Sequence, residues 1–366
     1  MPSPSAVSDQ EEQPRPAPER RYAWVMSTLR DTQATSRLVA LGELLVDVSP
    51  QTPGTSLEDD KTLQPLPGGA PANVAYAATL RGARSAVVGA VGGDAFGRRL
   101  RRTLAEAGVD VTGLVSVEAQ TAVAFVALGE AGEREFMFYG RPAAHDMLTA
   151  ADVDAFATAQ PFAVGDVLHL GSTSLAREPA RSATLHALRL ALRGGAAVSF
   201  DVNHRPALWD RPDLDEVRAL LRQVLEGSQR VKLSLDELEL LTGQRTRGAA
   251  AAFGAELVAR DARLVTVTLG AEGTWYVTRD GSGHVGGYPV TAVDTTGAGD
   301  AFTAAVIMAT LSDPATWDAV EATESALRTA CAYAALSTTR PGAMPSYGTG
   351  RELAEFMSAA RGQHGR

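Results

Sequence analysis

The residues best suited to chemistry lie in one glycine-rich segment, which reads Val293-Asp294-Thr295-Thr296-Gly297-Ala298-Gly299-Asp300-Ala301-Phe302. Small residues follow it and predict a helix that begins at Ala298. The first amides of a helix lack partners within the helix and lie at the positive end of its dipole, so the amides of Gly297, Ala298 and Gly299 can stabilise a phosphoryl group. Asp300 follows directly, where its carboxylate can accept a proton from an attacking hydroxyl. The alternative is an ordinary helix start with an aspartate in its first turn.

A second group of glycines and polar residues stands nearer the N-terminus. Gly68, Gly69 and Asn73 belong to Gly-Gly-Ala-Pro-Ala-Asn, and Asp47 lies at the end of an apolar run that begins at Leu38. Glycines let a ligand approach the backbone closely, and an asparagine amide both donates and accepts hydrogen bonds. This group therefore suits a ligand with many hydroxyls. Taken singly, Asn73 fits equally well as a first-turn helix residue and Asp47 as a strand-end cap.

The elements that must position these residues alternate along the chain from Arg37 onward. The pattern predicts strands at 38–48, 85–91, 167–170, 197–202, 230–233 and 264–269, and helices at 70–80, 97–107, 179–192, 214–225, 236–241 and 249–259 and from 298. This alternation is typical of a doubly wound, mostly parallel α/β sheet flanked by helices. Polar residues at the carboxyl ends of such strands converge on one ligand crevice.

Two stretches break the alternation, within residues 46–67 and 121–141. Both contain short strand-like runs without a helix between them, and the second is interrupted by a polar connection at 129–134 that is typical of a hairpin. Small strands inserted early into an α/β sheet predict a separate β-sheet lid. Closure of such a lid over the crevice would exclude water from the reaction.

Composition excludes several classes of protein. The chain has 366 residues, 45% of them hydrophobic and 21% charged, which is enough for one large domain or two smaller ones. Its 34 basic and 43 acidic residues give a net charge of -9, which disfavours nucleic acid as a partner. No apolar run has the length of a membrane span, so no membrane partner is expected. The single cysteine, Cys331, excludes an internal disulfide and favours a cytoplasmic location.

The domain boundary expected from the sequence lies near residue 36. Residues 1–36 are rich in proline, glutamine and arginine and are predicted to form a disordered N-terminal extension, whereas 37–366 form one domain. Within this domain, neither Lys61 nor Lys232 stands in a P-loop pattern. The segment 281–286 fits Gly-x-Gly-x-x-Gly, but no helix follows it, and we expect a hairpin turn there rather than a dinucleotide site.

The two glycine clusters resemble the signatures of the PfkB, or ribokinase-like, carbohydrate kinases. Residues 294–302 are similar to the family's C-terminal signature, and residues 68–75 with 91–97 are similar to its other signature region, in the family's order. The resemblance implies an enzyme that transfers the γ-phosphate of ATP to a primary hydroxyl of a small sugar. Asp300 would be the base, and the sugar would be bound by the positions that match the family's, which are Asp47, Gly68, Gly69, Asn73, Arg205 and Asp300.

The resemblance also implies a nucleotide site with Mg²⁺. The nucleotide would contact residues at strand ends and turns, namely Lys232, Ser234, Thr268, Gly270, Gly273, Gly297 and Gly299. Residues 201–205 resemble the family's Asp-x-Asn-x-Arg, which places Asn203 near magnesium. Ser234 and Glu237 have the spacing of a capping box, and Glu237 is also suited to order magnesium-bound water. Lys232 either approaches a phosphate or is a solvated strand-end residue.

By resemblance alone, Asp294 and Thr296 would hold K⁺ opposite the loop 339–343; otherwise Asp294 caps the glycine-rich loop. Residues 41–47, 134–139 and 203–209 resemble the fructokinase branch, so fructose is the expected acceptor. A 2-keto-3-deoxygluconate kinase or another sugar or nucleoside kinase is the alternative, and a homodimer through the lid is expected. A catalytically silent regulatory protein is the non-enzyme alternative, which the intact Asp300 and its glycines disfavour.

Overall fold

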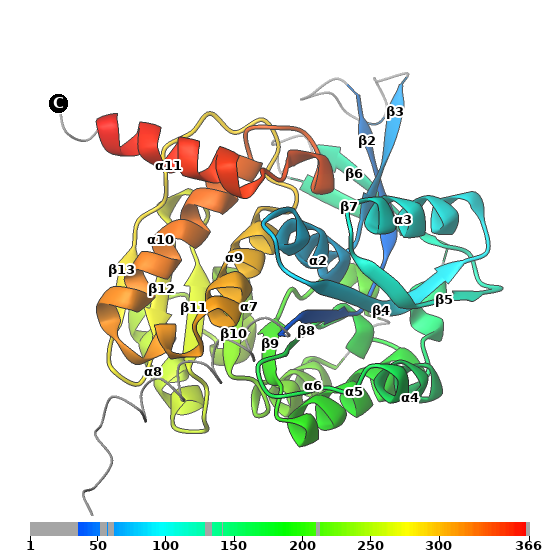
Figure 1. Ribbon diagram of the computed structural model, residues 1–366, viewed down its shortest axis with the longest axis horizontal. Coiled ribbons are helices and arrows are strands. Elements are labelled where there is room, and N and C mark those ends of the chain that lie inside the picture. Colours follow the sequence, from blue (N-terminus) through cyan, green and yellow to red (C-terminus); the bar gives the residue numbers. More distant parts are fainter. Residues whose placement is uncertain are drawn as a thin grey trace, which may run out of the picture. The chain divides into compact units, whose positions relative to one another are not determined.

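The computed structural model describes residues 36–51, 57, 62–128, 134–140, 142–209 and 213–363, which belong to one compact unit (Figure 1). Nearly all of the expected N-terminal extension, residues 1–35, lies outside the described residues. So do residues 129–133 of the expected lid connection and most of 52–61. Within the described part of the chain, no helix is both long and apolar enough to cross a membrane.

The main sheet has nine strands in the order β13-β12-β11-β10-β9-β8-β1-β4-β5. The seven strands from β11 to β5 are parallel, whereas β12 and β13 add an antiparallel hairpin at one edge. The predicted doubly wound α/β class is confirmed. The strand bounds are β1 (Leu38–Leu41), β4 (Ser85–Gly92), β5 (Asp110–Val117), β8 (Val167–Gly171), β9 (Ala197–Asp201), β10 (Arg230–Ser234), β11 (Leu264–Thr268), β12 (Thr274–Val277) and β13 (Ser282–Val285).

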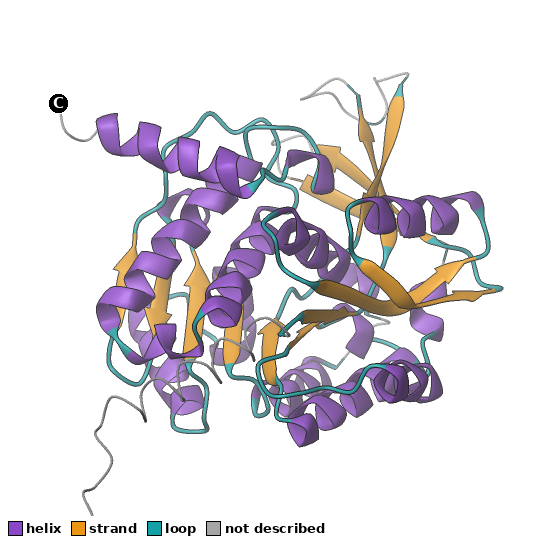
Figure 2. Cartoon of the chain, in the orientation of Figure 1, coloured by secondary structure: helices purple, strands orange, loops and turns teal. Residues whose placement is uncertain are grey.

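Helices cover both faces of this sheet (Figure 2). One apolar cluster joins the sheet to α4 (Ala150–Ala159), α5 (Ala180–Gly194), α6 (Leu214–Leu225), α7 (Leu235–Thr242) and α8 (Arg247–Val258). A second joins it to α2 (Ala70–Leu80), α3 (Ala95–Glu106), α9 (Ala298–Ser312), α10 (Val320–Ser337) and α11 (Gly350–Gln363). Val39 and Leu41 of β1 belong to the first cluster and Leu38 and Ala40 to the second, because successive side chains point to opposite faces. Burial on both faces explains why such strands are continuous apolar runs.

A second sheet has the order β3-β2-β6-β7 and forms the predicted small lid sheet (Figure 1). The pairs β2–β3 and β6–β7 are antiparallel and β2–β6 is parallel. The chain enters this sheet from the carboxyl end of β1 and leaves it into the N-terminus of α2. Its strands are β2 (Leu45–Pro50), β3 (Leu63–Gly68), β6 (Ala122–Leu128) and β7 (Arg134–Tyr139).

The expected first strand, 38–48, is in fact two strands in different sheets. The chain breaks at Gly42, whose φ is 152° and where a Cβ would overlap the ring of Pro71. Asp47 is therefore not at the end of a main-sheet strand; it lies within lid strand β2, opposite Leu66 and Ala124. Both parts of the run are buried, so hydrophobicity alone does not reveal the change of sheet.

The segment 281–286 is also corrected by the structure. Ser282–Val285 forms strand β13, paired antiparallel with β12, and the turn itself lies at 278–281, where the amide of Thr278 donates to the carbonyl of Gly281 at 2.8 Å. The strand is short, largely exposed and contains glycine, so its composition resembles that of a turn. No helix follows it directly, as expected from the sequence.

Candidate functional site

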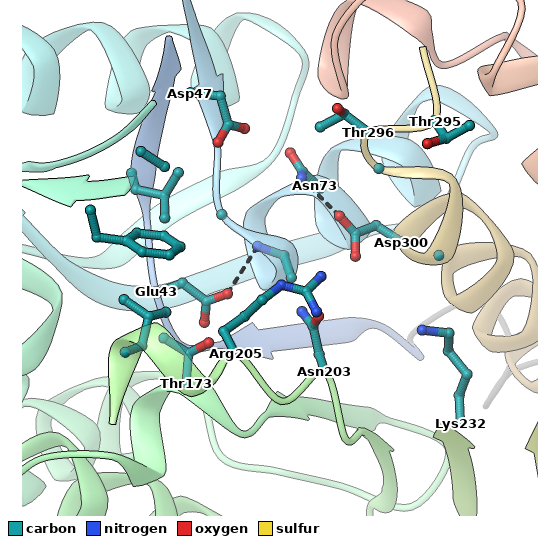
Figure 3. A pocket seen from close by; sticks show the side chains of 18 residues that line it. Glu43, Asp47, Asn73, Thr173, Asn203, Arg205, Lys232, Thr295, Thr296 and Asp300 are labelled. Carbon is teal, nitrogen blue, oxygen red and sulfur yellow. Dashed lines mark hydrogen bonds between the residues drawn. The ribbon is translucent and has the colours of Figure 1, made fainter. Parts of the chain in front are cut away.

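A cavity of about 300 Å³ lies where lid strands β2, β6 and β7 face the carboxyl ends of β8, β9 and β10 and the N-termini of α2 and α9 (Figure 3). This is the edge of an open α/β sheet at which ligands are expected. We call it the first cavity. It is lined by Glu43, Leu45, Asp47, Gly69, Ala70, Asn73, Ala124, Phe138, Thr173, Asn203, Arg205, Leu208, Lys232, Thr295, Thr296, Gly297, Gly299 and Asp300.

The N-terminus of α9 forms one wall of the first cavity. Gly297 is its N-cap with a φ of 77°, and a Cβ there would overlap the hydroxyl of Tyr347. That hydroxyl donates to the carbonyl oxygen of Gly297 at 3.1 Å and so supports the turn. The amide of Ala298 donates to the carbonyl of Thr295 at 3.3 Å, whereas Gly297 and Gly299 line the cavity. The predicted helix start is thus present, with Ala298 engaged in closing the turn.

Asp300 lies in the first turn of α9 and is 9% exposed. The side-chain amide of Asn73 donates to its Oδ2 at 2.8 Å, and the two side chains point toward each other in Figure 3. Burial raises the pKa of Asp300 from 3.8 to about 6, although the Asn73 hydrogen bond and the nearby charges of Lys232 and Arg205 oppose this rise. At neutral pH the carboxylate is mostly ionised and remains basic enough to take a proton, which is what a general base requires.

Two further carboxyl groups line the same cavity. Burial, together with the charge of Asp300, raises the pKa of Glu43 from 4.5 and that of Asp47 from 3.8 to about 7 each. The Asp47 carboxylate rests over Gly68, where a Cβ would overlap it. Gly69 is the N-cap of α2 with a φ of 103° and lies against the backbone oxygen of Glu43. Both predicted glycines are therefore required by close packing, Gly68 against the Asp47 carboxylate and Gly69 against the backbone at Glu43.

Sequence reasoning missed Glu43 as a site residue. Its signals are a charged residue directly after Gly42 within an apolar run and its place in the segment 41–47, which resembles the fructokinase branch. Thr173, after β8, and the apolar lining residues Leu45, Phe138 and Leu208 were also missed. None of these residues belongs to a recognisable chemical motif. They reach the cavity only because the lid and the neighbouring strands fold around it.

Asn203 and Arg205 follow β9 and both line the first cavity. Asn203 has a φ of 36°, which is unusual for a residue other than glycine and is often found at functional sites. The charge of Arg205 lowers the pKa values of Glu43, Asp47 and Asp300 relative to burial alone. In the view of Figure 3 its guanidinium lies between Glu43 and Asp300.

Lys232 is neither exposed nor directed at an open strand end. Its ammonium forms an ion pair with both carboxylate oxygens of Asp201, at 2.8 and 3.0 Å. Burial lowers its pKa, but the Asp201 carboxylate and neighbouring acids outweigh burial and raise it above the usual value. Lys232 therefore brings a permanent charge to the border of the first cavity while it neutralises a buried aspartate.

The capping box predicted at the start of α7 is confirmed. The amide of Glu237 donates to the Ser234 hydroxyl at 3.3 Å, and Glu237 Oε2 accepts the Ser234 amide at 2.7 Å. Glu237 Oε1 accepts the amide of His204 at 2.9 Å, so this carboxylate also holds the loop that carries Asn203 and Arg205. Burial raises the pKa of Glu237. Neither Ser234 nor Glu237 is among the residues that line the cavities described here.

A second cavity, of about 530 Å³, lies on the other side of the α9 N-terminus. Four predicted nucleotide residues, Thr268, Gly270, Gly273 and Gly299, contribute to its lining. Two residues, Thr295 and Gly299, line both cavities, so a ligand in one can meet a ligand in the other at the first turn of α9. The remaining lining residues are Ala271, Gly287, Tyr288, Pro289, Val290, Ala292, Ala298, Phe302, Cys331, Ala334, Ala335 and Thr338.

Asp294 lies in the glycine-rich loop before α9 and connects it to the loop 339–343. Its Oδ1 accepts the amide of Thr296 and its Oδ2 that of Gly342, each at 2.8 Å, so the carboxylate caps the glycine-rich loop and holds the loop 339–343 against it. Within the described ranges, no three His, Cys, Asp or Glu residues are grouped as metal ligands. A divalent cation bound at either cavity would therefore take most of its ligands from phosphate and water, as Mg²⁺ commonly does at phosphate sites.

Comparison with known proteins gives one consistent result. Residues 35–349 match the model of the pfkB family carbohydrate kinases. The chain is 40% identical over 324 residues to Fructokinase-1 of Oryza sativa subsp. japonica, covering 88% of this chain and 98% of the rice protein.

Solved structures agree with the sequence comparison. The structure of fructokinase from Vibrio cholerae O395 in fructose, ADP and calcium ion bound form has a TM-score of 0.77 and 34% identity, and a double mutant in potassium ion bound form has a TM-score of 0.78. Fructokinase with bound ATP from Xylella fastidiosa has a TM-score of 0.77 and 33% identity. Each comparison covers 88% of this chain and 98% of the other.

Proposed function

Because this chain belongs to the pfkB family of carbohydrate kinases and is a phosphotransferase that acts on a sugar hydroxyl, we propose that it transfers the γ-phosphate of ATP to a primary hydroxyl of fructose. The observation that carries the proposal is the position of Asp300. It lies in the first turn of α9 and lines the first cavity, directly after Gly299, one of the two residues that line both cavities. We place the sugar in the first cavity and the nucleotide in the second.

In this mechanism Asp300 removes the proton from the primary hydroxyl as it attacks the γ-phosphorus. The hydrogen bond from Asn73 holds Oδ2 and leaves the other carboxylate oxygen for the substrate. The amides of Gly297 and Gly299 and the dipole of α9 stabilise the charge on the transferred phosphoryl group. The Ala298 amide, which donates to Thr295, would join them only after a small rearrangement of the turn.

The polar lining of the first cavity supports a neutral sugar over a sugar acid. Glu43, Asp47 and Asp300 contribute three carboxyl groups, whereas Lys232 is already paired with Asp201 and Arg205 already lowers the pKa values of all three acids. A carboxylate such as that of 2-keto-3-deoxygluconate would meet the ionised Asp300 and the partly ionised Glu43 and Asp47. Hydroxyls can instead donate to the carboxylates. Asp47 and Asn73 are the groups we expect to contact the sugar, above Gly68 and Gly69.

The cations remain part of the proposal. Mg²⁺ would bind together with the ATP phosphates near Asn203, and Glu237 would orient its water ligands while keeping its capping hydrogen bonds. Bound Mg²⁺ neutralises charge on the phosphates during transfer. Asp294 and Thr296 would hold K⁺ between the two loops that the Asp294 carboxylate already joins. Activity in K⁺ that exceeds activity in Na⁺ at equal ionic strength would support the second site, and equal activity would remove it.

Two further expectations accompany the kinase assignment. A homodimer through the lid is supported by exposed apolar side chains on both lid edges, Leu63 on β3 and Met137 and Tyr139 on β7. Sedimentation of the wild type and of Met137→Glu would test it, because an apolar interface at β7 cannot accept a charge. The single cysteine supports a reducing, cytoplasmic location.

The deciding experiment measures ADP release with ATP and a panel of acceptors: fructose, 2-keto-3-deoxygluconate, ribose and nucleosides. We expect the highest kcat/KM for fructose. The kcat/KM for the sugar acid, 2-keto-3-deoxygluconate, should be lower by about tenfold or more. Preference for another acceptor would reject fructose and retain the kinase. No ADP release with any of the acceptors, together with tight ATP binding, would favour a regulatory protein without catalytic activity.

A further inference from the structure

Glu43 is the one acidic residue of the first cavity to which the mechanism above gives no individual role. It stands in the turn between β1 and β2 and is 4% exposed. Its Oε1 accepts the amide of Ala70, the first residue of α2, at 3.1 Å. Its Oε2 is buried and has no hydrogen-bond partner within the described residues. Buried carboxylate oxygens almost always have a partner, so this one requires an explanation.

The surroundings of Glu43 indicate what would supply that partner. It lines the first cavity together with Asp47, Asn73, Arg205 and Asp300, so it belongs to the ring of polar groups around the space assigned to the sugar (Figure 3). The contact with Ala70 fixes one oxygen of the carboxyl group at the N-terminus of α2, and this anchors the other. An anchored, unpaired acceptor beside a cavity is satisfied when a ligand brings a donor.

We propose that Glu43 is a specificity-determining residue that binds one hydroxyl of the acceptor sugar through Oε2. The inference rests on the proposed function and adds to it a residue that selects the substrate. A sugar without that hydroxyl leaves Oε2 unpaired, and sites built to pair a hydroxyl reject such analogues strongly. The competing explanation is structural: Glu43 would only join the β1–β2 turn to α2 through the Ala70 amide.

The test compares Glu43→Gln and Glu43→Ala with the wild type, using fructose and fructose analogues that each lack one hydroxyl other than the one phosphorylated. Glu324→Gln is the matched control, because Glu324 pairs with Tyr276 and Arg328 and lines neither cavity. With fructose, we expect Glu43→Ala to lower kcat/KM by about tenfold, the loss of one hydrogen bond to a buried carboxyl group. The loss should appear mainly in the KM for fructose and leave the KM for ATP unchanged. Glu43→Gln keeps the shape and should lose less.

The analogues separate the two explanations. For one analogue, the kcat/KM of the wild type should fall by about the factor by which Glu43→Ala lowers kcat/KM for fructose. The kcat/KM of Glu43→Ala should fall little further when fructose is replaced by that analogue. If every analogue lowers kcat/KM by the same factor in the wild type and in Glu43→Ala, the two losses are additive. That result would overturn the inference and leave Glu43 a structural residue. So would a kcat/KM for fructose within about twofold of the wild type in Glu43→Ala.

Two measurements keep these outcomes interpretable. Thermal unfolding and the KM for ATP show whether each variant is folded, and Glu43→Gln retains an oxygen for the Ala70 amide if Glu43→Ala does not fold. Failure of the proposed function looks different, because the wild type itself would not phosphorylate fructose. The same comparison is then made with the sugar that the acceptor panel identifies and with its deoxy analogues. Additive losses in kcat/KM from Glu43→Ala and from each missing hydroxyl would again overturn the inference.

Discussion

Replacing Asp300 by asparagine should remove the base without changing the shape of the site. Asparagine has the size of aspartate, and its amide oxygen can accept the hydrogen bond that Asn73 donates to Oδ2 at 2.8 Å in the wild type. A general base contributes roughly 10² to 10⁴ in rate. We therefore expect kcat to fall by about that factor, while the affinities for fructose and ATP change by less than about threefold.

The same substitution should stabilise the protein at neutral pH. Burial raises the pKa of Asp300 from 3.8 to about 6, so the folded state holds this proton more tightly than the unfolded state. The stability contributed by such a group is fully present below about pH 4 and is lost as the pH rises through about 6. By linkage the loss is on the order of 3 kcal/mol at pH 7.5. An asparagine side chain does not titrate, so the Asp300→Asn variant avoids that loss.

Two assays test this prediction together. Coupled ADP release and calorimetric titration with each substrate give the rate and the affinities. Urea unfolding at pH 4.5 and pH 7.5 gives the free energy of unfolding. The variant should gain about 2 kcal/mol more at the higher pH, because about 1 of the roughly 3 kcal/mol is already lost at pH 4.5. Asp213→Asn, at the exposed N-cap of α6, is the control and should change neither quantity. A kcat within about tenfold of the wild type, or a stability difference independent of pH, would refute the reasoning.

Three other substitutions test separate parts of the site. Lys232→Met leaves the Asp201 carboxylate buried without its ion-pair partner, which should cost about 3 to 5 kcal/mol in urea unfolding; a cost below about 1 kcal/mol would contradict the pairing. Tyr347→Phe removes the hydrogen bond to the Gly297 carbonyl and should lower kcat up to about tenfold with the sugar KM unchanged, so an effect on KM alone would count against a role in holding the α9 turn. Gly69→Ala adds a Cβ at a φ of 103° against a backbone oxygen, and we expect a loss above about 2 kcal/mol in thermal unfolding, which an unchanged Tm would disprove.

The features that could be predicted from the sequence are local ones. Alternating strands and helices indicate the α/β class because each element is recognised within about ten residues. The capping box of Ser234 and Glu237 depends only on the spacing of neighbouring residues, and the start of α9 needs only the glycines around Ala298. In each case the interacting groups are neighbours along the chain, so their contact is determined by the backbone conformation of one element.

The features that could not be predicted depend on distant partners. The apolar run 38–48 does not reveal that β1 and β2 belong to different sheets, so the strand predicted for Asp47 is wrong. Lys232 has the appearance of a strand-end lysine until Asp201, 31 residues away, is placed beside it. Glu43 lies in the segment 41–47, but the sequence assigns it no role; its role is suggested only by its burial and by an oxygen that no neighbour among the described residues satisfies.

The sequence by itself therefore determined which chemical groups are present and the local turns that carry them: a glycine-rich helix start followed by an aspartate, and a pair of glycines followed by an asparagine. Only the tertiary structure decided how these groups act on one another. Asn73 and Asp300 are 227 residues apart, yet their hydrogen bond and shared burial hold the pKa of the base at about 6. Burial and the placement of distant charges are properties of the folded chain, because they depend on which elements pack together and not on any one of them.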